Sequence, residues 1–396
     1  MEIVAEHNSE SPSEGRRGTV VLVIDGLGRG GAERLLALYA PAIRALGYRA
    51  IVVTLQVRDG NAEAEKLRAA GIAVRHVELT KLRNVTELRK VIACIREPKP
   101  SVIHTHLEAA TVVGGIASAV LRVPAVTTLH TLEHPTGINR ASFRLWVLRL
   151  LLTHIYDRVL CLSDTIADEA REHGLRRAPL VTLPNGILPP ESLDDRCTVR
   201  KRLRAELGIS EGALVVVTVA VLRPPKGVDR LLAAMSYVLA SVPDAILLVV
   251  GDGSEREQLE QQTRDQGIAH RVVFTGFRED VYDLLRSSDL FVLPTLWDTL
   301  PTVVIEAMFA SLPIVASRVG GIPDMVEHGV QGALVPPGDV PALASAILGM
   351  LTDARRRETI GLAALRRAET DFSLSIQVQK LADLYDEVIA GVRPPS

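Results

Sequence analysis

The stretch "LPNGILPPESLDD", residues 183–195, lies near the middle of the 396-residue chain and decides its fold. Proline, glycine, asparagine and acidic residues favour turns and linkers over regular structure. On both sides of this stretch, short apolar runs alternate with longer segments of helical periodicity. A chain of this length is also too long for a single hydrophobic core. We therefore predict two domains joined near residues 184–195.

The apolar runs have the length and composition of strands that are buried on both faces. Seven precede the linker and six follow it, at 19–24, 49–54, 73–77, 101–105, 125–129, 158–162, 180–183, 213–220, 245–250, 271–276, 290–294, 313–317 and 332–336. Helical patterns separate them, including 31–46, 84–96, 108–121 and 139–155. Such alternation is typical of parallel sheets covered by helices. We predict an α/β fold with two doubly wound, Rossmann-like domains that face a central cleft.

The domain boundaries follow from the same pattern. We expect a disordered tail at 1–17, an N-terminal domain at 18–190 and a C-terminal domain at 191–372. A last helix, within 373–396, is expected to pack back on the N-terminal domain. In open α/β sheets ligands bind at the carboxyl ends of the strands, so the loops that follow the strands should carry the function.

The composition excludes several kinds of protein. Aromatic residues make up 4% of the chain and the formal net charge is −2, which argues against nucleic-acid binding. The cysteines Cys94, Cys161 and Cys197 lack metal-ligand spacing and indicate a reducing compartment. No apolar run is long enough to span a bilayer, and the first residues do not resemble a signal peptide. We expect a cytoplasmic protein without a metal site.

A glycine-rich loop, "GLGRGGAERLL" (26–36), follows the first strand. Gly30 and Gly31 permit close approach of the backbone, and a helix that begins near Gly31 offers N–H groups to an anion. The letters also satisfy the dinucleotide fingerprint, but the second strand ends in Thr54 and Leu55 instead of the acid that would bind a ribose. We favour a phosphate or sugar loop, with a structural turn as the alternative.

Three histidines lie near strand ends in the first half. His130 is placed at the carboxyl end of the fifth strand, where we expect a functional role. His106 is predicted to lie in the loop after the fourth strand, and His104 is interpreted as a core histidine.

The stretch "VAVLRPPKGVDRLLAA" (219–234) places Arg223 and Lys226 just before a predicted helix. Two cations beside a helix N-terminus suit a diphosphate, whose oxygens accept from both side chains and from the first N–H groups. The alternative is a solvated basic turn.

The stretch "WDTLPTVVIEAM" (297–308) carries two acids around another predicted helix N-terminus. Asp298 lies in the loop, Glu306 lies on the helix, and Thr302 and Val303 offer N–H groups to a phosphate. Carboxylates accept hydrogen bonds from neighbouring hydroxyls. The pair therefore suits a nucleotide sugar, with one acid on the ribose and the other near the sugar.

Two further loops of the second half are weaker candidates. Gly276 and Phe277 follow a strand, where backbone groups would pair with a nucleobase edge and the ring would pack nearby. Gly251 and Gly253 are interpreted as positions of backbone packing.

Taken together, these segments resemble glycosyltransferase family 4, a family of retaining enzymes with the GT-B fold. The matching segments run in the family's order over about residues 19–350: "GRGGAER", "VIHTHL", "VTTLH", "LCLSDTIADE", "LPNGI", "RPPKG", "GDGSEREQL", "VVFTGFREDV", "DLFVLPT", "DTLPTVVIEAM" and "VASRVGGIPDMVEHGVQGALVPPGD".

The resemblance implies roles for the matched residues. Lys226 would neutralise the diphosphate, Glu306 would hold the ribose hydroxyls, and Asp298 would contact the donor sugar or its phosphate. The N–H groups of Thr299 and Leu300 would face sugar hydroxyls, and those of Thr302 and Val303 would face the diphosphate. Gly30 and Gly31 would approach the donor, and His130 would lie by the sugar.

The chain departs from the family pattern at three positions. Asp298 stands where the family usually has Glu, and Thr299 stands where Gly often follows. The usual Arg, five residues before the Lys, falls on Val221, and Arg223 is the nearest replacement.

The implied function is a metal-independent, retaining transfer of a hexose from a UDP- or GDP-sugar, without another cofactor. The acceptor would be a hydroxyl of a glycan or lipid-linked saccharide in cell-surface polysaccharide synthesis. The mixed basic and apolar segment 139–158 either contacts an anionic membrane or a polyprenyl-diphosphate acceptor, or is a packed domain helix. The alternatives are a nucleotide-sugar 2-epimerase of similar fold and an inactive sugar-binding homologue.

Overall fold

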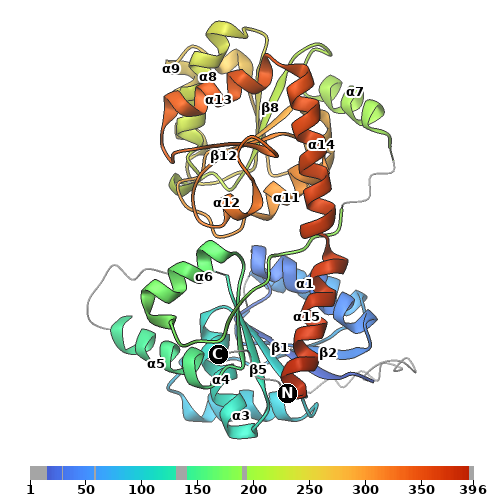
Figure 1. The fold of residues 1–396 in the computed structure, drawn as a ribbon, viewed down its shortest axis with the longest axis vertical. Coiled ribbons are helices and arrows are strands. Elements are labelled where there is room, and N and C mark those ends of the chain that lie inside the picture. The colour runs from blue at the N-terminus through green and yellow to red at the C-terminus, as the bar shows by residue number, and fades with distance from the viewer. Residues whose placement is uncertain (1–15, 29, 58, 131–140, 190–193, 392–396) are drawn as a thin grey trace. The chain divides into compact units, whose positions relative to one another are not determined.

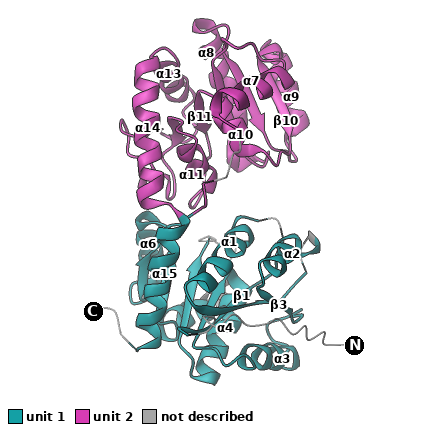
Figure 2. Cartoon of the chain, turned by 90° about the vertical axis from the view of Figure 1, so that its right-hand side faces the viewer, with its two compact units in different colours: residues 1–186, 374–396 teal, residues 187–373 magenta. Residues whose placement is uncertain are grey.

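The computed structural model describes residues 16–28, 30–57, 59–130, 141–189 and 194–391, with the backbone alone at 59 and 141–145 (Figure 1). Contacts divide the chain into two compact units (Figure 2). Unit 1 comprises residues 1–186 and 374–396, and unit 2 comprises residues 187–373. Most of the predicted tail lies outside the described residues.

Within the described residues, unit 1 is built on a seven-stranded parallel sheet with the strand order β3-β2-β1-β4-β5-β6-β7. Its strands are β1 (Gly18–Ile24), β2 (Tyr48–Thr54), β3 (Ala73–His76), β4 (Val102–His106), β5 (Ala125–Leu129), β6 (Arg158–Cys161) and β7 (Leu180–Thr182). Its main helices are α1 (Gly31–Ala45), α2 (Ala62–Ala69), α3 (Val85–Arg96), α4 (Glu108–Leu121), α5 (Ala141–His154), α6 (Asp164–Ala170) and α15 (Leu374–Ile389).

Strand β1 shows why these strands are apolar along their whole length. Leu22 and Ile24 belong to a buried cluster that includes residues of α1 and α15, whereas Val21 and Val23 belong to a second cluster with residues of α3 and α4. Successive side chains of a strand point to opposite faces, so a strand that is covered on both faces must be apolar at every position.

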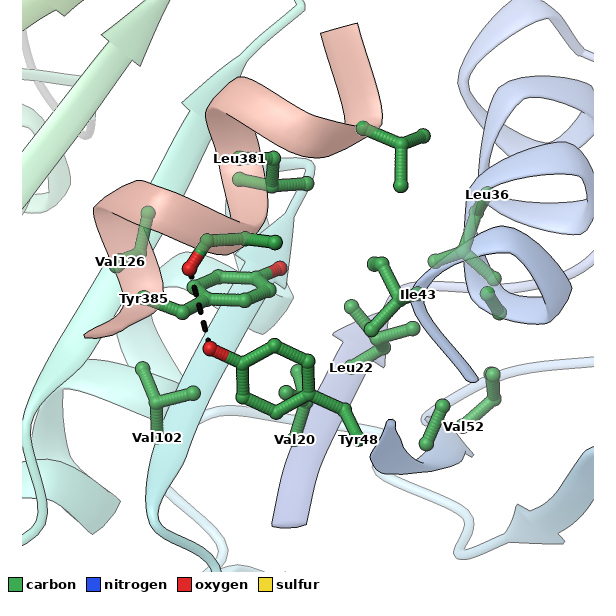
Figure 3. Packing of buried hydrophobic residues seen from close by; sticks show 14 of the residues in the cluster. Val20, Leu22, Leu36, Ile43, Tyr48, Val52, Val102, Val126, Leu381 and Tyr385 are labelled. Atoms are coloured by element: carbon green, nitrogen blue, oxygen red, sulfur yellow. Dashed lines mark hydrogen bonds between the residues drawn. The ribbon is translucent and has the colours of Figure 1, made fainter. Parts of the chain in front are cut away.

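The terminal helix α15 completes the core of unit 1. The rings of Tyr48 on β2 and Tyr385 on α15 meet edge to face, with centroids 5.7 Å apart (Figure 3). The Tyr48 hydroxyl donates to the carbonyl of Ala382 at 3.1 Å, which is drawn dashed in the figure. Arg17 also forms an ion pair with Asp386, so the first described residues are tied to the last helix.

In the described part of unit 2, six parallel strands follow the order β10-β9-β8-β11-β12-β13. They are β8 (Val215–Val219), β9 (Ile246–Val250), β10 (Val272–Gly276), β11 (Leu290–Leu293), β12 (Ile314–Ser317) and β13 (Gly332–Val335). The helices are α7 (Arg196–Glu206), α8 (Val228–Ser241), α9 (Arg256–Asp265), α10 (Val281–Ser287), α11 (Thr302–Phe309), α12 (Ile322–Met325), α13 (Val340–Leu351) and α14 (Ala354–Asp371), with the short 3₁₀ helix η3 (Pro224–Lys226) before α8.

Both sheets confirm the prediction of two doubly wound parallel-sheet domains. In each unit the strand order reverses at one place, between β1 and β4 in unit 1 and between β8 and β11 in unit 2. Loops diverge to opposite faces at such a reversal and leave a crevice at the carboxyl ends of the strands. The residues that follow β1, β4, β8 and β11 are therefore the first to inspect for a site.

Candidate active site

At the reversal in unit 2, the structure brings together two residues that are 72 positions apart. Lys226 lies at the end of η3, after β8, and Asp298 lies in the loop after β11. The Lys226 Nζ atom donates to Asp298 Oδ2 at 2.5 Å, and the two side chains are 20% and 17% exposed. A charged pair with this much remaining exposure still has donors and oxygen lone pairs open to a ligand.

Close backbone contacts hold the two loops together. Gly227 has a φ of +66°, and a Cβ atom there would lie 2.3 Å from the carbonyl oxygen of Pro294. The carbonyl of Pro225 accepts from the amide of Leu296 at 2.8 Å and from the hydroxyl of Thr295 at 3.0 Å. Glycine is therefore required after Lys226, because any side chain would separate the β8 loop from the β11 loop.

The other side of the β11 loop packs on the loop after β12. Gly320 has a φ of +50°, and a Cβ atom there would lie 1.7 Å from the carbonyl oxygen of Asp298. The amide of Gly321 donates to the carbonyl of Thr299 at 2.8 Å. Asp298 is thus fixed from both sides.

Thr299 differs from its expected role. Its amide donates to Asp298 Oδ1 at 3.1 Å, so this N–H group serves the carboxylate and does not point to a free acceptor site. Its hydroxyl oxygen is buried and has no hydrogen-bond partner among the described residues. Leu300, the next residue, is buried as well.

Helix α11 places the remaining predicted groups of unit 2. Its first residues, Thr302 and Val303, are half-buried, and the first N–H groups of a helix lack acceptors within it. Pro301 precedes the helix with extended backbone, and Val304 donates to its carbonyl at 3.0 Å. Glu306 is half-buried on the same helix. The helix therefore presents positive backbone dipoles at its start and a carboxylate further along.

Arg223, Gly276 and Phe277 are the remaining predicted site residues of unit 2. The side chain of Arg223 is exposed, as is that of Val221, where the family's arginine would fall. The carbonyl of Gly276 accepts from the amide of Gly251 at 2.9 Å, and Phe277 is 59% exposed. The backbone at Gly276 is therefore already engaged in sheet-like pairing.

The two glycines of the β9 loop serve backbone packing, as the sequence indicated. Cβ atoms at Gly251 and Gly253 would lie 2.0 Å and 2.2 Å from the carbonyl oxygens of Ala220 and Leu222.

In unit 1, the loop after β1 behaves differently at its two candidate glycines. A Cβ atom at Gly30 would lie 2.2 Å from the carboxylate of Glu33, which folds back over the start of α1. A Cβ atom at Gly31 would meet no atom of the described residues within 4 Å. The space above Gly31 is thus open to a ligand, whereas that above Gly30 is used by the protein itself.

His104, His106 and His130 form one cluster at the carboxyl ends of β4 and β5. His106 is the last residue of β4, not a loop residue, because it pairs in register with Ile24 of β1 and Thr128 of β5. The His106 Nδ1 and His130 Nε2 atoms are 3.0 Å apart. His104 is 2% exposed and, as predicted, a core histidine.

An apolar pocket borders this cluster. Its main polar groups are three imidazoles, two hydroxyls and one amide. The lining residues come from α1, α15, the strand ends and the residues that follow them: Leu22, Leu35, Leu36, Tyr39, Ile43, His104, His106, Thr128, His130, Leu160, Leu162, Leu183, Pro184, Asn185 and Leu381. Burial lowers the pKa of all three imidazoles, that of His104 to about 3. The cluster is therefore neutral near pH 7, and each ring donates through one nitrogen and accepts through the other.

Helix α5 belongs to the predicted segment 139–158. Leu151 and Leu152 are buried in the core of unit 1, whereas Trp146 is 58% exposed. This packing agrees with a domain helix. Residues 139 and 140 and the side chain of Arg144 lie outside what the structure describes. Across the described helices, none has the length and apolarity to cross a membrane.

Two family models match the chain, and each covers one of the candidate clusters. The model described as "Glycosyl transferases group 1" matches residues 199–367, which include Lys226 and Asp298. The model described as "Glycosyltransferase Family 4" matches residues 29–189, which include the histidine cluster.

Two curated relatives are similar over most of the chain. The UDP-Gal:alpha-D-GlcNAc-diphosphoundecaprenol alpha-1,3-galactosyltransferase of Escherichia coli is 23% identical over 342 residues, which are 83% of this chain and 86% of the relative. The alpha-D-kanosaminyltransferase of Streptomyces kanamyceticus is 29% identical over 321 residues, which are 78% of this chain and 81% of the relative.

A solved structure agrees over nearly the whole fold. Anabaena Alr3699/HepE in complex with UDP has a TM-score of 0.82 and 27% identity, and covers 92% of this chain and 99% of that one. Its complex with UDP-glucose has a TM-score of 0.79 and 28% identity, and covers 92% of this chain and 98% of that one.

Proposed function

This chain belongs to glycosyltransferase family 4, and we propose that it is a retaining enzyme that transfers a hexose from a UDP-sugar to a hydroxyl group. Its two parallel-sheet units have the GT-B architecture. The observation that carries the proposal is the contact between Lys226 and Asp298, at the reversal of the unit 2 sheet and within the matched glycosyl transferase segment.

The donor assignment rests on the relatives as well as on the site. The Anabaena protein was crystallised with UDP-glucose, and the Escherichia coli enzyme is named for UDP-Gal. We therefore favour a UDP-hexose over a GDP-sugar. The diphosphate would bind Lys226 and the N–H groups at the start of α11, and Glu306 would accept from the ribose hydroxyls.

The acceptor is proposed to be a glycan or a lipid-linked saccharide used in cell-surface polysaccharide synthesis. The Escherichia coli relative is named for a diphosphoundecaprenol-linked acceptor, which supports this class. We propose that the protein acts in the cytoplasm. The UDP-sugar would be its co-substrate, and it would need no other cofactor.

The proposed transfer needs no acid or base from outside the two substrates. The bond between the anomeric carbon and the diphosphate oxygen breaks, and the acceptor oxygen bonds to that carbon on the same face. The acceptor proton passes to the departing diphosphate oxygen. Lys226 and the α11 dipole stabilise the charge that develops on the diphosphate, which is the role that a metal ion has in other transferases. The resemblance to the family also gives His130 a hydrogen bond to a sugar hydroxyl.

Ligand-induced thermal shift tests the donor site. We expect UDP-glucose or UDP-galactose to raise the melting temperature of the purified protein, because a ligand that binds only the folded state stabilises it. Lys226→Ala should abolish the shift, whereas Lys201→Ala, at an exposed lysine on α7, should keep it. A shift that survives in Lys226→Ala would contradict the proposed diphosphate site.

The transfer itself is tested with the same donors. Proton NMR of the product formed from a donor with an α-linked sugar should show an α-glycoside, and treatment with EDTA should leave the rate unchanged. A β-linked product would exclude retention, and loss of the rate after EDTA would exclude metal independence.

A further inference from the structure

A buried tyrosine of the terminal helix contacts the histidine cluster. Tyr385 is fully buried on α15, and its hydroxyl lies 2.6 Å from His104 Nδ1. Among the described residues, His104 is the partner of this hydroxyl. A buried O–H group needs an acceptor, so Tyr385 donates and His104 accepts through Nδ1.

This assignment fixes the tautomer of His104. A neutral imidazole that accepts at Nδ1 carries its proton on Nε2, and Nε2 lies 2.8 Å from the hydroxyl oxygen of Thr128. His104 therefore donates to Thr128 on β5 while it accepts from α15. Both ring nitrogens are held, so the ring has one orientation.

From His104 the contacts continue toward the carboxyl end of β5. The ring centroids of His104 and His106 are 4.3 Å apart with an interplanar angle of 36°. Those of His106 and His130 are 5.3 Å apart, with the hydrogen bond between them described above. The side chains of Tyr385, His104, His106 and His130 thus form a continuous row from the core to the pocket.

We propose that Tyr385 and His104 are positioning residues of the transfer reaction, which hold His106 and thereby the imidazole of His130. The inference rests on the proposed function, because it assigns these contacts to the ring that would meet the sugar. Each ring of the row contacts the next, so a change in the orientation of one ring alters the contacts of its neighbour. Without the Tyr385 hydroxyl, His104 gains a second tautomer and His106 loses its fixed support.

The variant Tyr385→Phe tests the proposal with the removal of a single oxygen. Its matched control is Tyr48→Phe, at the tyrosine whose ring packs edge to face against Tyr385. The Tyr48 hydroxyl bonds to Ala382 and Asp386 on α15, so both variants remove one hydroxyl at the same helix, but only Tyr385 bonds to a histidine.

Long-range ¹H–¹⁵N NMR of the imidazole nitrogens in the full-length protein provides a readout that needs no substrate. We expect the Nε2–H tautomer at His104 in the wild type. Tyr385→Phe should mix the tautomers and shift the signals of His106 and His130, whereas Tyr48→Phe should leave all three rings unchanged. The proposal is overturned if wild-type His104 is the Nδ1–H tautomer, or if Tyr385→Phe leaves His106 and His130 unmoved.

Steady-state kinetics then separate positioning from stability. With the donor found by thermal shift, Tyr385→Phe should lower kcat by about tenfold with an unchanged donor KM, because small misplacements of a reacting group slow transfer. Tyr48→Phe should stay within about twofold of the wild type. Equal losses of kcat in both variants would show that Tyr385 has only a structural role.

If the wild type transfers no sugar, the proposed function fails, while the NMR result still decides whether the histidines are held as described.

Discussion

At the scale of single residues, Thr299 combines two features that a sequence pattern does not reveal. Its amide serves the carboxylate of Asp298, and its hydroxyl is buried without a partner among the described residues. An unpaired buried hydroxyl costs free energy because it has given up its hydrogen bonds to water. A threonine in this place therefore destabilises the loop that it occupies.

We expect Thr299→Val to raise the free energy of unfolding by about 1 kcal/mol, because it replaces the unpaired hydroxyl with a methyl group of similar volume. Urea denaturation measures the change. The control is Thr295→Val in the same loop, whose hydroxyl donates to Pro225 and Trp297 and whose removal should cost about 1 kcal/mol. If Thr299→Val is the more destabilising of the two, the Thr299 hydroxyl is hydrogen-bonded in solution.

The residues of the site were predictable to different degrees. Lys226 and Asp298 were identified separately by their positions after strands, and the structure brings them together. The bond from the Thr299 amide was not predictable, because the direction of an N–H group in a loop depends on backbone dihedrals. The predicted strand ends at residue 105, which places His106 in a loop, but pairing with Ile24 of β1 and Thr128 of β5 extends β4 by one residue to His106.

At the scale of elements, the strands and helices followed directly from the apolar pattern. The predicted strand at 125–129 and the predicted helix at 108–121 coincide with β5 and α4. A parallel sheet covered on both faces requires continuous apolar runs, and these are the strongest signal in the sequence. The contacts that lock the loops are between backbone atoms, so composition contains little information about them.

The lock between the β11 and β12 loops is testable at Gly320. We expect Gly320→Ala to lower the free energy of unfolding by several kcal/mol, since a methyl group would combine a left-handed φ with a clash against the Asp298 carbonyl. Gly329→Ala is the control, because Gly329 also has a positive φ, of +88°, but open space around it.

The control should cost about 1 kcal/mol, which is the strain of the backbone alone. Chemical denaturation followed by circular dichroism compares the two variants. Equal losses at the two glycines would show that the close approach at Asp298 is relieved without cost.

At the scale of the whole molecule, the buried imidazoles couple the stability of unit 1 to pH. Burial lowers the pKa of His104 from 6.5 to about 3 in the folded protein. The unfolded chain therefore binds a proton as the pH falls below 6.5, while the folded protein does not. The stabilisation is complete above the unfolded pKa and is lost as the pH falls toward the folded one.

We expect acidification from about pH 7.5 to about pH 5 to remove about 2 kcal/mol of stability through His104 alone. Differential scanning calorimetry of the wild type and of His104→Asn at both pH values measures the contribution. The variant should lose less stability on acidification than the wild type. An equal loss in the two proteins would mean that His104 titrates normally and is not sealed from water.

The return of α15 to unit 1 sets the order in which a nascent chain becomes structured. Leu374, Val378, Leu381 and Tyr385 cover an apolar face of unit 1, yet they are translated after all of unit 2. During translation this apolar face of unit 1 stays uncovered until α15 has been synthesised. Residues 187–373, in contrast, contain all the residues of the unit 2 core. A premature stop codon between unit 2 and α15 would release a chain with a folded unit 2. Its unit 1 would expose an apolar surface to chaperones and proteases.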